Sequence, residues 1–319
     1  MMKQAFFILF ASVISLVAVI SSAESDPARV EKLKNDGNDQ FRRGNFEKAI
    51  ELYTQAIELD STYAFAYNNL GISLYEIGDY AGSVRNLQKA VALDSTYSKA
   101  YNSLGNAQFA LGDYEGAEES FRSTIALGPD IAQKHINLGN AYYAHGLWDE
   151  AIAEFEKAAS MDSRSAESMN NMGAAYQRKG DIEKARESYM AATKIDSRYA
   201  QPLVNLGTIH YDNGRGDIDQ AIEYYDKAIR IDKENVLANY NLGLAYSVKG
   251  DYTKALTALR NALRNAPDDA DILYSLGLTS AARKTYPSAI NYYEKALAVN
   301  PEHPYVRQAL ENAKRQSGN

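Results

Sequence analysis

The chain contains no cysteine, which excludes disulfide bridges and any chemistry that needs a thiolate. Its four histidines are scattered, and no two of them stand at the helical spacing of a metal-ligand pair. Basic residues are outnumbered by acidic ones, and the net charge of −7 leaves no basic footprint for nucleic acid. No catalytic set of residues is present in the sequence. These absences favour a protein that is not an enzyme and that uses no cofactor and no metal.

Repetition dominates the rest of the sequence. Residues 64–97 form a unit of 34 residues, and about eight such units follow one another. A glycine stands at the eighth position of this unit, as Gly71. With one shift of two residues, caused by an insertion in the sixth unit, the glycine returns as Gly105, Gly139, Gly173, Gly207, Gly243 and Gly277. A fixed period of this length predicts a solenoid, in which each unit packs on its neighbours.

Each unit has the pattern of two helices joined by a short turn. Apolar or small residues recur in 67–74 at the spacing i, i+3, i+4, i+7, which is typical of one buried helix face. Gly78-Asp79 interrupts the pattern, and a second apolar stripe follows in 84–91. The short turn predicts an antiparallel pair of helices. Gly71 is then expected to be a packing residue, at the place where the two backbones come closest.

The residue order of the unit resembles the tetratricopeptide repeat: Leu-Gly, Tyr, Gly-Asp-Tyr, Ala, Tyr or Phe, Ala, then Leu-Asp-Pro. The resemblance covers residues 30–303 in eight units. It implies an all-α, right-handed superhelical solenoid that binds a peptide or protein, mostly on its concave side. The expected units are 30–63, 64–97, 98–131, 132–165, 166–199, 200–235, 236–269 and 270–303.

The two ends of the chain differ from the repeats. Residues 1–23 start with Lys3, continue as an uncharged apolar run and end in Ser21-Ser22-Ala23, which is typical of a cleaved secretory signal. An uncleaved membrane anchor is the alternative, and only then would the chain contact a membrane. Residues 24–29 are expected to be a short linker. Residues 304–319 are expected to form a capping helix and tail, which cover the end of the last repeat.

Asparagine recurs at the sixth position of the unit, near the inner face of the first helix. Its amide can both donate and accept hydrogen bonds, which suits contact with a peptide backbone. The ladder is similar to one in the tetratricopeptide arrays of protein O-glycosyltransferases, and this similarity implies the same role. The alternative is hydrogen bonding within the array. The ladder consists of Asn35, Asn69, Asn137, Asn171, Asn205 and Asn241.

A possible carboxylate pocket is suggested by the first three repeats, which partly resemble those of the carboxylate-clamp cochaperones. Lys34, Asn38, Asn69 and Lys99 stand where that family holds the C-terminal carboxylate of its partner. The fifth residue of the set is normally basic, and here it is Ser103. The second cation on that helix is therefore missing. The alternative is that these are ordinary solvated residues of the scaffold.

The inner face is expected to become apolar toward the last repeats, which favours a hydrophobic contact zone there. Packing between repeats is the alternative explanation. The apolar set consists of Val204, Leu237, Tyr240, Leu244, Tyr274 and Leu278. The tyrosines occupy matching positions in neighbouring repeats and are expected to anchor the partner.

The sequence thus predicts a non-enzymatic scaffold, exported from the cytoplasm, that binds a protein or an extended peptide in its concave groove. We expect it in the periplasm, in the cell envelope or secreted. A structural or self-assembling protein of the cell envelope is the alternative. The partner and the oligomeric state are not specified by these patterns.

We expect residues 1–23 to be removed during export, because the apolar run is short and Ser21 and Ala23 supply the small residues of a cleavage site. Mass spectrometry of the native protein should find Glu24 as the first residue. An N-terminus at Met1 or Met2 would contradict this expectation.

Overall fold

The computed structural model describes residues 26–212 and 216–318 of the chain. The predicted leader at 1–23 and Arg215 of the inserted turn lie outside these ranges. Within them every regular element is a helix, and none of these helices has the length and apolar character needed to cross a membrane. The chain divides into two compact units, 1–147 and 148–319, and each is described by itself.

The first unit contains α2 to α8, whose bounds are Pro27–Arg42, Phe46–Leu59, Ala64–Glu76, Tyr80–Leu93, Ser98–Leu111, Tyr114–Ala126 and Ala132–His145. The second unit contains α9 to α18, whose bounds are Trp148–Met161, Ala166–Lys179, Ile182–Ile195, Ala200–Tyr211, Ile218–Ile231, Val236–Lys249, Tyr252–Asn265, Ala270–Ala282, Tyr286–Val299 and Val306–Ser317.

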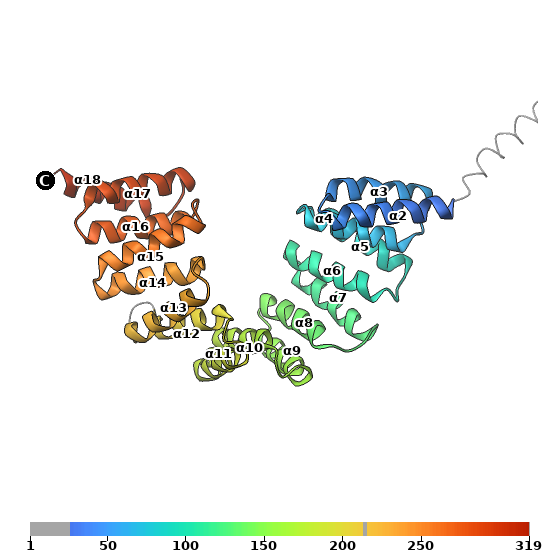
Figure 1. The fold of residues 1–319 in the computed structure, drawn as a ribbon, viewed down its shortest axis with the longest axis horizontal. Helices are drawn as coiled ribbons and strands as arrows, with labels where there is room; N and C mark the ends of the chain where they lie inside the picture. Colours follow the sequence, from blue (N-terminus) through green and yellow to red (C-terminus); the bar gives the residue numbers. More distant parts are fainter. Residues whose placement is uncertain (1–25, 213–215, 319) are drawn as a thin grey trace, which may run out of the picture. The chain divides into compact units, whose positions relative to one another are not determined.

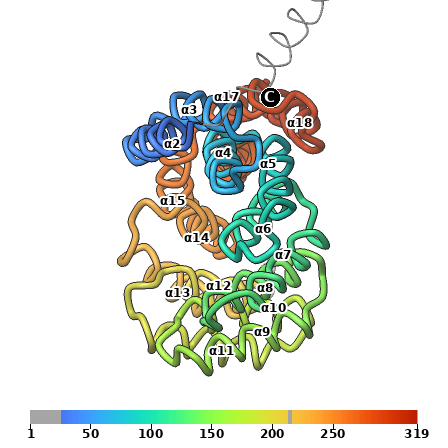
Figure 2. The backbone as a smooth tube through the Cα atoms, turned by 90° about the vertical axis from the view of Figure 1, so that its right-hand side faces the viewer, coloured from blue at the N-terminus to red at the C-terminus, as the bar shows by residue number. Residues whose placement is uncertain are grey.

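Within each unit, successive helices pack as antiparallel hairpins that stack on one another (Figure 1, Figure 2). α2 pairs with α3, α4 with α5 and α6 with α7, as the period of 34 residues requires. First helices of neighbouring hairpins also contact one another, as α2 does with α4 and α4 with α6. The predicted solenoid of helix-turn-helix units is confirmed. The fourth repeat supplies α8 to the first unit and α9 to the second.

Glycine at the eighth position allows the two helices of a hairpin to touch. A Cβ atom on Gly207 would lie 2.5 Å from the ring of Tyr225, and one on Gly71 would lie 2.5 Å from Leu87. Carbon atoms in good contact stay about 3.5–4.0 Å apart. The same clash would occur at Gly37, Gly105, Gly173, Gly243 and Gly277. The packing role predicted for this glycine is confirmed.

The large side chain that faces the glycine is often tyrosine, which explains part of the high tyrosine content. Tyr53, Tyr189, Tyr225 and Tyr293 are almost fully buried. Buried tyrosine normally keeps its hydroxyl hydrogen-bonded, and that of Tyr53 donates to Asn38 Oδ1 at 2.7 Å. Burial raises the pKa of both Tyr225 and Tyr293 to about 12, because the phenolate would be poorly solvated.

The Gly-Asp turn ends one helix and begins the next. Gly250 ends α14 in the left-handed conformation, with φ of 82°, and Asp251 then accepts a hydrogen bond from the backbone N–H of Lys254. The last repeat departs from this pattern. Lys284 occupies the glycine position with φ of 63°, a conformation that costs a side chain with a Cβ about 1–2 kcal/mol.

α18 covers the end of the last hairpin. Val306 and Ala313 of α18 are buried in one cluster with Leu273 and Tyr293. His303, in the turn before α18, is 6% exposed and places Nε2 3.0 Å from Asp271 Oδ1 of α16. The terminal helix therefore belongs to the same packed stack as the repeats.

Replacing Leu206 with alanine should lower the free energy of unfolding by about 2–5 kcal/mol, because its side chain is 1% exposed. Since repeats pack only on their neighbours, hydrogen exchange should show lost protection concentrated around repeats five to seven. The matched control is Leu237→Ala, where the leucine is 47% exposed and the loss should be small. An equal loss of protection over all repeats would contradict the expectation.

Replacing Lys284 with glycine should raise the free energy of unfolding by roughly 0.5–1 kcal/mol, because glycine adopts positive φ without strain. Lys295→Gly provides the control, since Lys295 is exposed within α17 and glycine there should cost about 1 kcal/mol. Chemical denaturation of the two variants should move the midpoint in opposite directions. A decrease for Lys284→Gly would show that this turn is not strained.

Candidate functional site

The asparagine ladder links first helices of adjacent repeats. Asn137 Nδ2 donates to Asn102 Oδ1 at 3.1 Å, between repeats four and three. Asn205 Nδ2 donates to Asn170 Oδ1 at 3.0 Å, between repeats six and five. Both bonds join the sixth position of one repeat to the fifth position of the repeat before it. The ladder is therefore part of the structure of the array.

The other members of the ladder differ in their partners. Asn69 Nδ2 donates to Asn38 Oδ1 at 2.8 Å, and Asn69 Oδ1 accepts from Asn68 Nδ2 at 2.9 Å. Asn171 Oδ1 accepts from Asn170 at 3.2 Å, and Asn35 reaches Glu31 only at 3.5 Å.

Asn241 shows why the ladder is not uniform. The fifth position of the preceding repeat is Val204, whose aliphatic side chain cannot accept the bond that Asn102 and Asn170 accept elsewhere. An amide has two N–H groups and two acceptor sites on its oxygen, so bonding within the array does not exhaust it. Hydrogen bonding within the array, the alternative considered from the sequence, is thus present at Asn69, Asn137 and Asn205. Contact of these amides with a partner stays a prediction.

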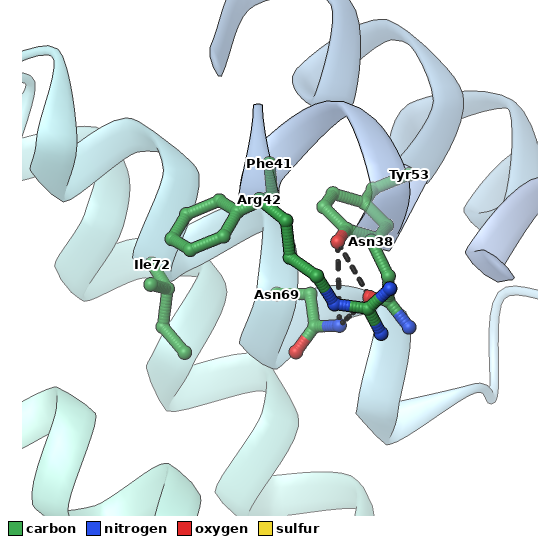
Figure 3. Close-up of a pocket in the computed structure, with 6 residues that line it drawn as sticks. All are labelled: Asn38, Phe41, Arg42, Tyr53, Asn69 and Ile72. Atoms are coloured by element: carbon green, nitrogen blue, oxygen red, sulfur yellow. Dashed lines mark hydrogen bonds between the residues drawn. The ribbon is translucent and has the colours of Figure 1, made fainter. Parts of the chain in front are cut away.

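Two similar pockets lie along the first helices of the first unit. The first aromatic pocket has a volume of about 240 Å³ and is lined by Asn38, Phe41, Arg42, Tyr53, Asn69 and Ile72 (Figure 3). The second aromatic pocket has a volume of about 200 Å³ and is lined by Asn106, Phe109, Phe121, Asn137, Asn140 and Tyr143. The second repeats the first, two repeat lengths further along the chain. Figure 3 shows Asn69, Asn38 and the hydroxyl of Tyr53 pointing toward one another, as their hydrogen bonds require.

A larger cavity of about 550 Å³, here called the polar cavity, lies between these two pockets. It shares Asn69 and Ile72 with the first aromatic pocket and Asn137 with the second, so the three adjoin. Lys99 and Lys134 both line it. No aspartate or glutamate stands among the described residues that line it. The polar cavity therefore favours an anionic group.

The predicted carboxylate set is divided between these sites. Asn38 and Asn69 lie in the first aromatic pocket, whereas Lys99 lies in the polar cavity. Lys34 is paired with Glu31 and stands over the ring of Phe65, 5.4 Å from its centroid. The hydrogen bond and the charge of Lys34 lower the pKa of the Glu31 carboxyl. The four residues thus do not converge on one group.

Lys134 was missed by the sequence reasoning, although it supplies the second cation that Ser103 lacks. It lies half-buried on α8, and its ammonium donates a hydrogen bond to the carbonyl oxygen of Thr124. A signal was present in the sequence. Its position, the third of the repeat, is alanine in Ala66, Ala100 and Ala238, so a lysine there is exceptional.

The apolar set of repeats six to eight includes one residue that must be corrected. Val204 is 0% exposed and belongs to the cluster around Tyr225, so it is a packing residue and cannot line a binding surface. The reason is that the fifth position faces the neighbouring repeat in this part of the array. Leu237 and Leu278 are exposed, and Leu244 is half-buried.

The two predicted anchor tyrosines also contribute to packing. The ring of Tyr274 lies 5.0 Å from the ring of His303 and 6.3 Å from that of Tyr305, and burial raises its pKa. The hydroxyl of Tyr240 lies 3.3 Å from Ser275 Oγ. Tyr274 also lines a cavity of about 360 Å³ together with Leu278 and residues of α18. Truncation of Tyr274 would therefore remove contacts to the terminal turn as well as cavity surface.

Comparison with curated proteins finds short matches. A segment of 47 residues is 45% identical to the small glutamine-rich tetratricopeptide repeat-containing protein alpha of Rattus norvegicus, over 15% of each chain. A segment of 42 residues is 48% identical to serine/threonine-protein phosphatase T of Schizosaccharomyces pombe, over 13% of this chain and 9% of that protein. The matches thus span only a small part of these relatives.

Solved structures resemble much more of the chain. The crystal structure of the hetero-tetramer Cut9-Hcn1 of APC/C matches with a TM-score of 0.59 and 20% identity, over 94% of this chain and 58% of that chain. The crystal structure of MamA protein matches with a TM-score of 0.50 and 26% identity, over 54% of this chain and 94% of that chain. At 20% identity, the first of these likenesses concerns the fold alone.

Family models agree with the period read from the sequence. Residues 37–78 match a model described as TPR repeat, and residues 66–93 match one described as tetratricopeptide repeat. Residues 83–316 match the model of the cilia and flagella-associated protein 70 C-terminal domain, which covers more than half of the chain. The chain therefore belongs to the tetratricopeptide repeat family, and within it to the family of the cilia and flagella-associated protein 70 C-terminal domain.

Proposed function

We propose that the chain is a scaffold that binds an extended segment of a partner protein along the first helices of its first unit. The observation that supports the proposal most strongly is the row of three adjoining cavities on α2, α4, α6 and α8. A row of cavities fits a continuous segment better than a single compact ligand. The aromatic pockets can bury large side chains, and the amides between them can bond to the backbone of the segment.

Binding, rather than catalysis, is the role that these residues suit. Aromatic rings supply most of the binding energy in protein interfaces, and amides set register and orientation. The phosphatase among the similar proteins is matched over 9% of its length, so its activity is not transferred to this chain. The proposal therefore names no substrate and no cofactor.

The place of action is proposed from the sequence alone. Residues 1–23 have the pattern of a secretory signal, which supports a role outside the cytoplasm, in the periplasm or the cell envelope. A self-assembling envelope protein remains the second candidate, because Leu237 and Leu278 expose apolar surface. Light scattering of the mature protein separates the two: a monodisperse monomer favours the binding scaffold.

Two exposed apolar residues decide which unit binds the partner. We would select binders for the full chain from a displayed library of random dodecapeptides, and then measure their affinity for two variants. Phe109 lines the second aromatic pocket and is 37% exposed, whereas Leu278 lies in the second unit and is 44% exposed. Phe109→Ala should weaken binding by about 2 kcal/mol, roughly thirtyfold, if Phe109 contacts an anchor side chain. Leu278→Ala should change it little.

The opposite result would place the site in repeats six to eight, as the sequence predicted. Circular dichroism and the melting temperature serve as folding controls, because Phe109 also contacts Tyr114, at 5.4 Å between ring centroids. If Phe109→Ala is unstable, Asn106→Ala tests the same pocket from an exposed position. Failure to select any peptide would count against the proposed function itself.

A further inference from the structure

Building on the proposed function, we propose that the partner segment presents two large apolar side chains about six residues apart, with an aspartate or glutamate between them. Three features of the first unit support this pattern: the two aromatic pockets are alike, their separation is defined by the stacking of the repeats, and the cavity between them contains uncompensated positive charge.

The two aromatic pockets present the same groups from the same positions of the repeat. Asn38, Phe41 and Asn69 of the first pocket correspond to Asn106, Phe109 and Asn137 of the second. In both, an aromatic ring of the second helix faces the pocket, from Tyr53 or from Phe121. Equivalent pockets suit equivalent side chains. Rings of phenylalanine and tyrosine prefer other rings and large apolar groups at such distances.

The stacking of the first helices sets the distance between the pockets. α2 contacts α4 and α4 contacts α6, so moving from one pocket to the other crosses two helix spacings. Packed helices are 8–10 Å apart, which puts the pockets roughly 20 Å from each other. An extended chain advances about 3.3 Å per residue, so roughly six residues span this distance. Side chains alternate along an extended chain, so residues i and i+6 face the same side.

The charge of the polar cavity determines what lies between the two anchors. Lys99 is exposed on α6, and Lys134 is held by the carbonyl oxygen of Thr124. The cavity therefore holds two cations and no lining carboxylate, in contrast to Lys34, which has Glu31 beside it. A carboxylate that enters can accept charge-assisted hydrogen bonds from both ammonium groups.

The carboxylate is expected to be a side chain rather than the end of the partner. The polar cavity adjoins an aromatic pocket on each side, so a segment that fills both pockets continues in both directions past the lysines. An acidic residue two or four positions after the first anchor would face the same side of an extended segment as both anchors.

Synthetic peptides test the pattern directly. The probe is a ten-residue peptide, acetylated and amidated, with phenylalanine at positions 2 and 8, glutamate at position 4 or 6, and serine or glycine elsewhere. Titration into the full chain should show binding that weakens at least about tenfold when glutamate is replaced by glutamine. Shifting the second phenylalanine by one position should also weaken binding, because that side chain then faces the other way.

Protein variants assign the effect to the two lysines. In Lys99→Met with Lys134→Met, the glutamate and glutamine peptides should bind with equal affinity. Lys89→Met is the matched control, since Lys89 is exposed on α5 and should leave the difference intact. If the double variant fails to fold, Lys99→Met alone tests the idea, and it should reduce the difference.

The outcomes separate this pattern from the proposed function. Library peptides that bind the first unit without the apolar–acidic–apolar pattern would leave the proposed function intact and overturn the pattern. Tighter binding by a peptide with a free C-terminus and no glutamate would show that the lysines bind a terminal carboxylate, which also overturns the pattern. Absence of any binding to the first unit would overturn both.

Discussion

The close approach of two helices at one glycine is the constraint on which each hairpin depends. At Gly207 and Gly71 no Cβ atom would fit beside the facing side chain, and the same is true in most other repeats. Because the backbones touch there, the second helix can bury one large residue against the first. The hairpin then becomes a thin layer that stacks on its neighbours. Everything that the first helices present to a partner is positioned by this repeated contact.

This stacking also determines which polar groups remain for binding. The asparagines at the sixth position donate to the preceding repeat, as Asn137 does to Asn102 and Asn205 does to Asn170. Such bonds hold each amide in a defined orientation and still leave a second N–H group. An oriented amide loses less conformational freedom when a partner binds, which lowers the cost of association. Structural and binding roles of the ladder therefore support one another.

The fold could be read from the sequence because each repeat states it again. The period, the packing role of Gly71 and the turn at Gly250 and Asp251 follow from local patterns. The candidate site could be read only in part. Val204 was taken for a surface residue, yet contact with the neighbouring repeat buries it. Lys134 was overlooked because its place in the polar cavity depends on packing between repeats three and four. Such relations between repeats are not encoded in the spacing of one unit.

The same distinction explains why the two units differ as candidates for binding. In the second unit, Tyr274 packs on His303 and Tyr305, so its ring contributes to the attachment of α18 as well as to any surface. In the first unit, Lys99 is exposed and stands among the residues that line the polar cavity. Lys134 already has an acceptor in Thr124, but a backbone carbonyl is neutral and leaves its charge unbalanced. A charge that the fold itself does not neutralise is available to a partner, whereas a ring that the fold needs for packing is not.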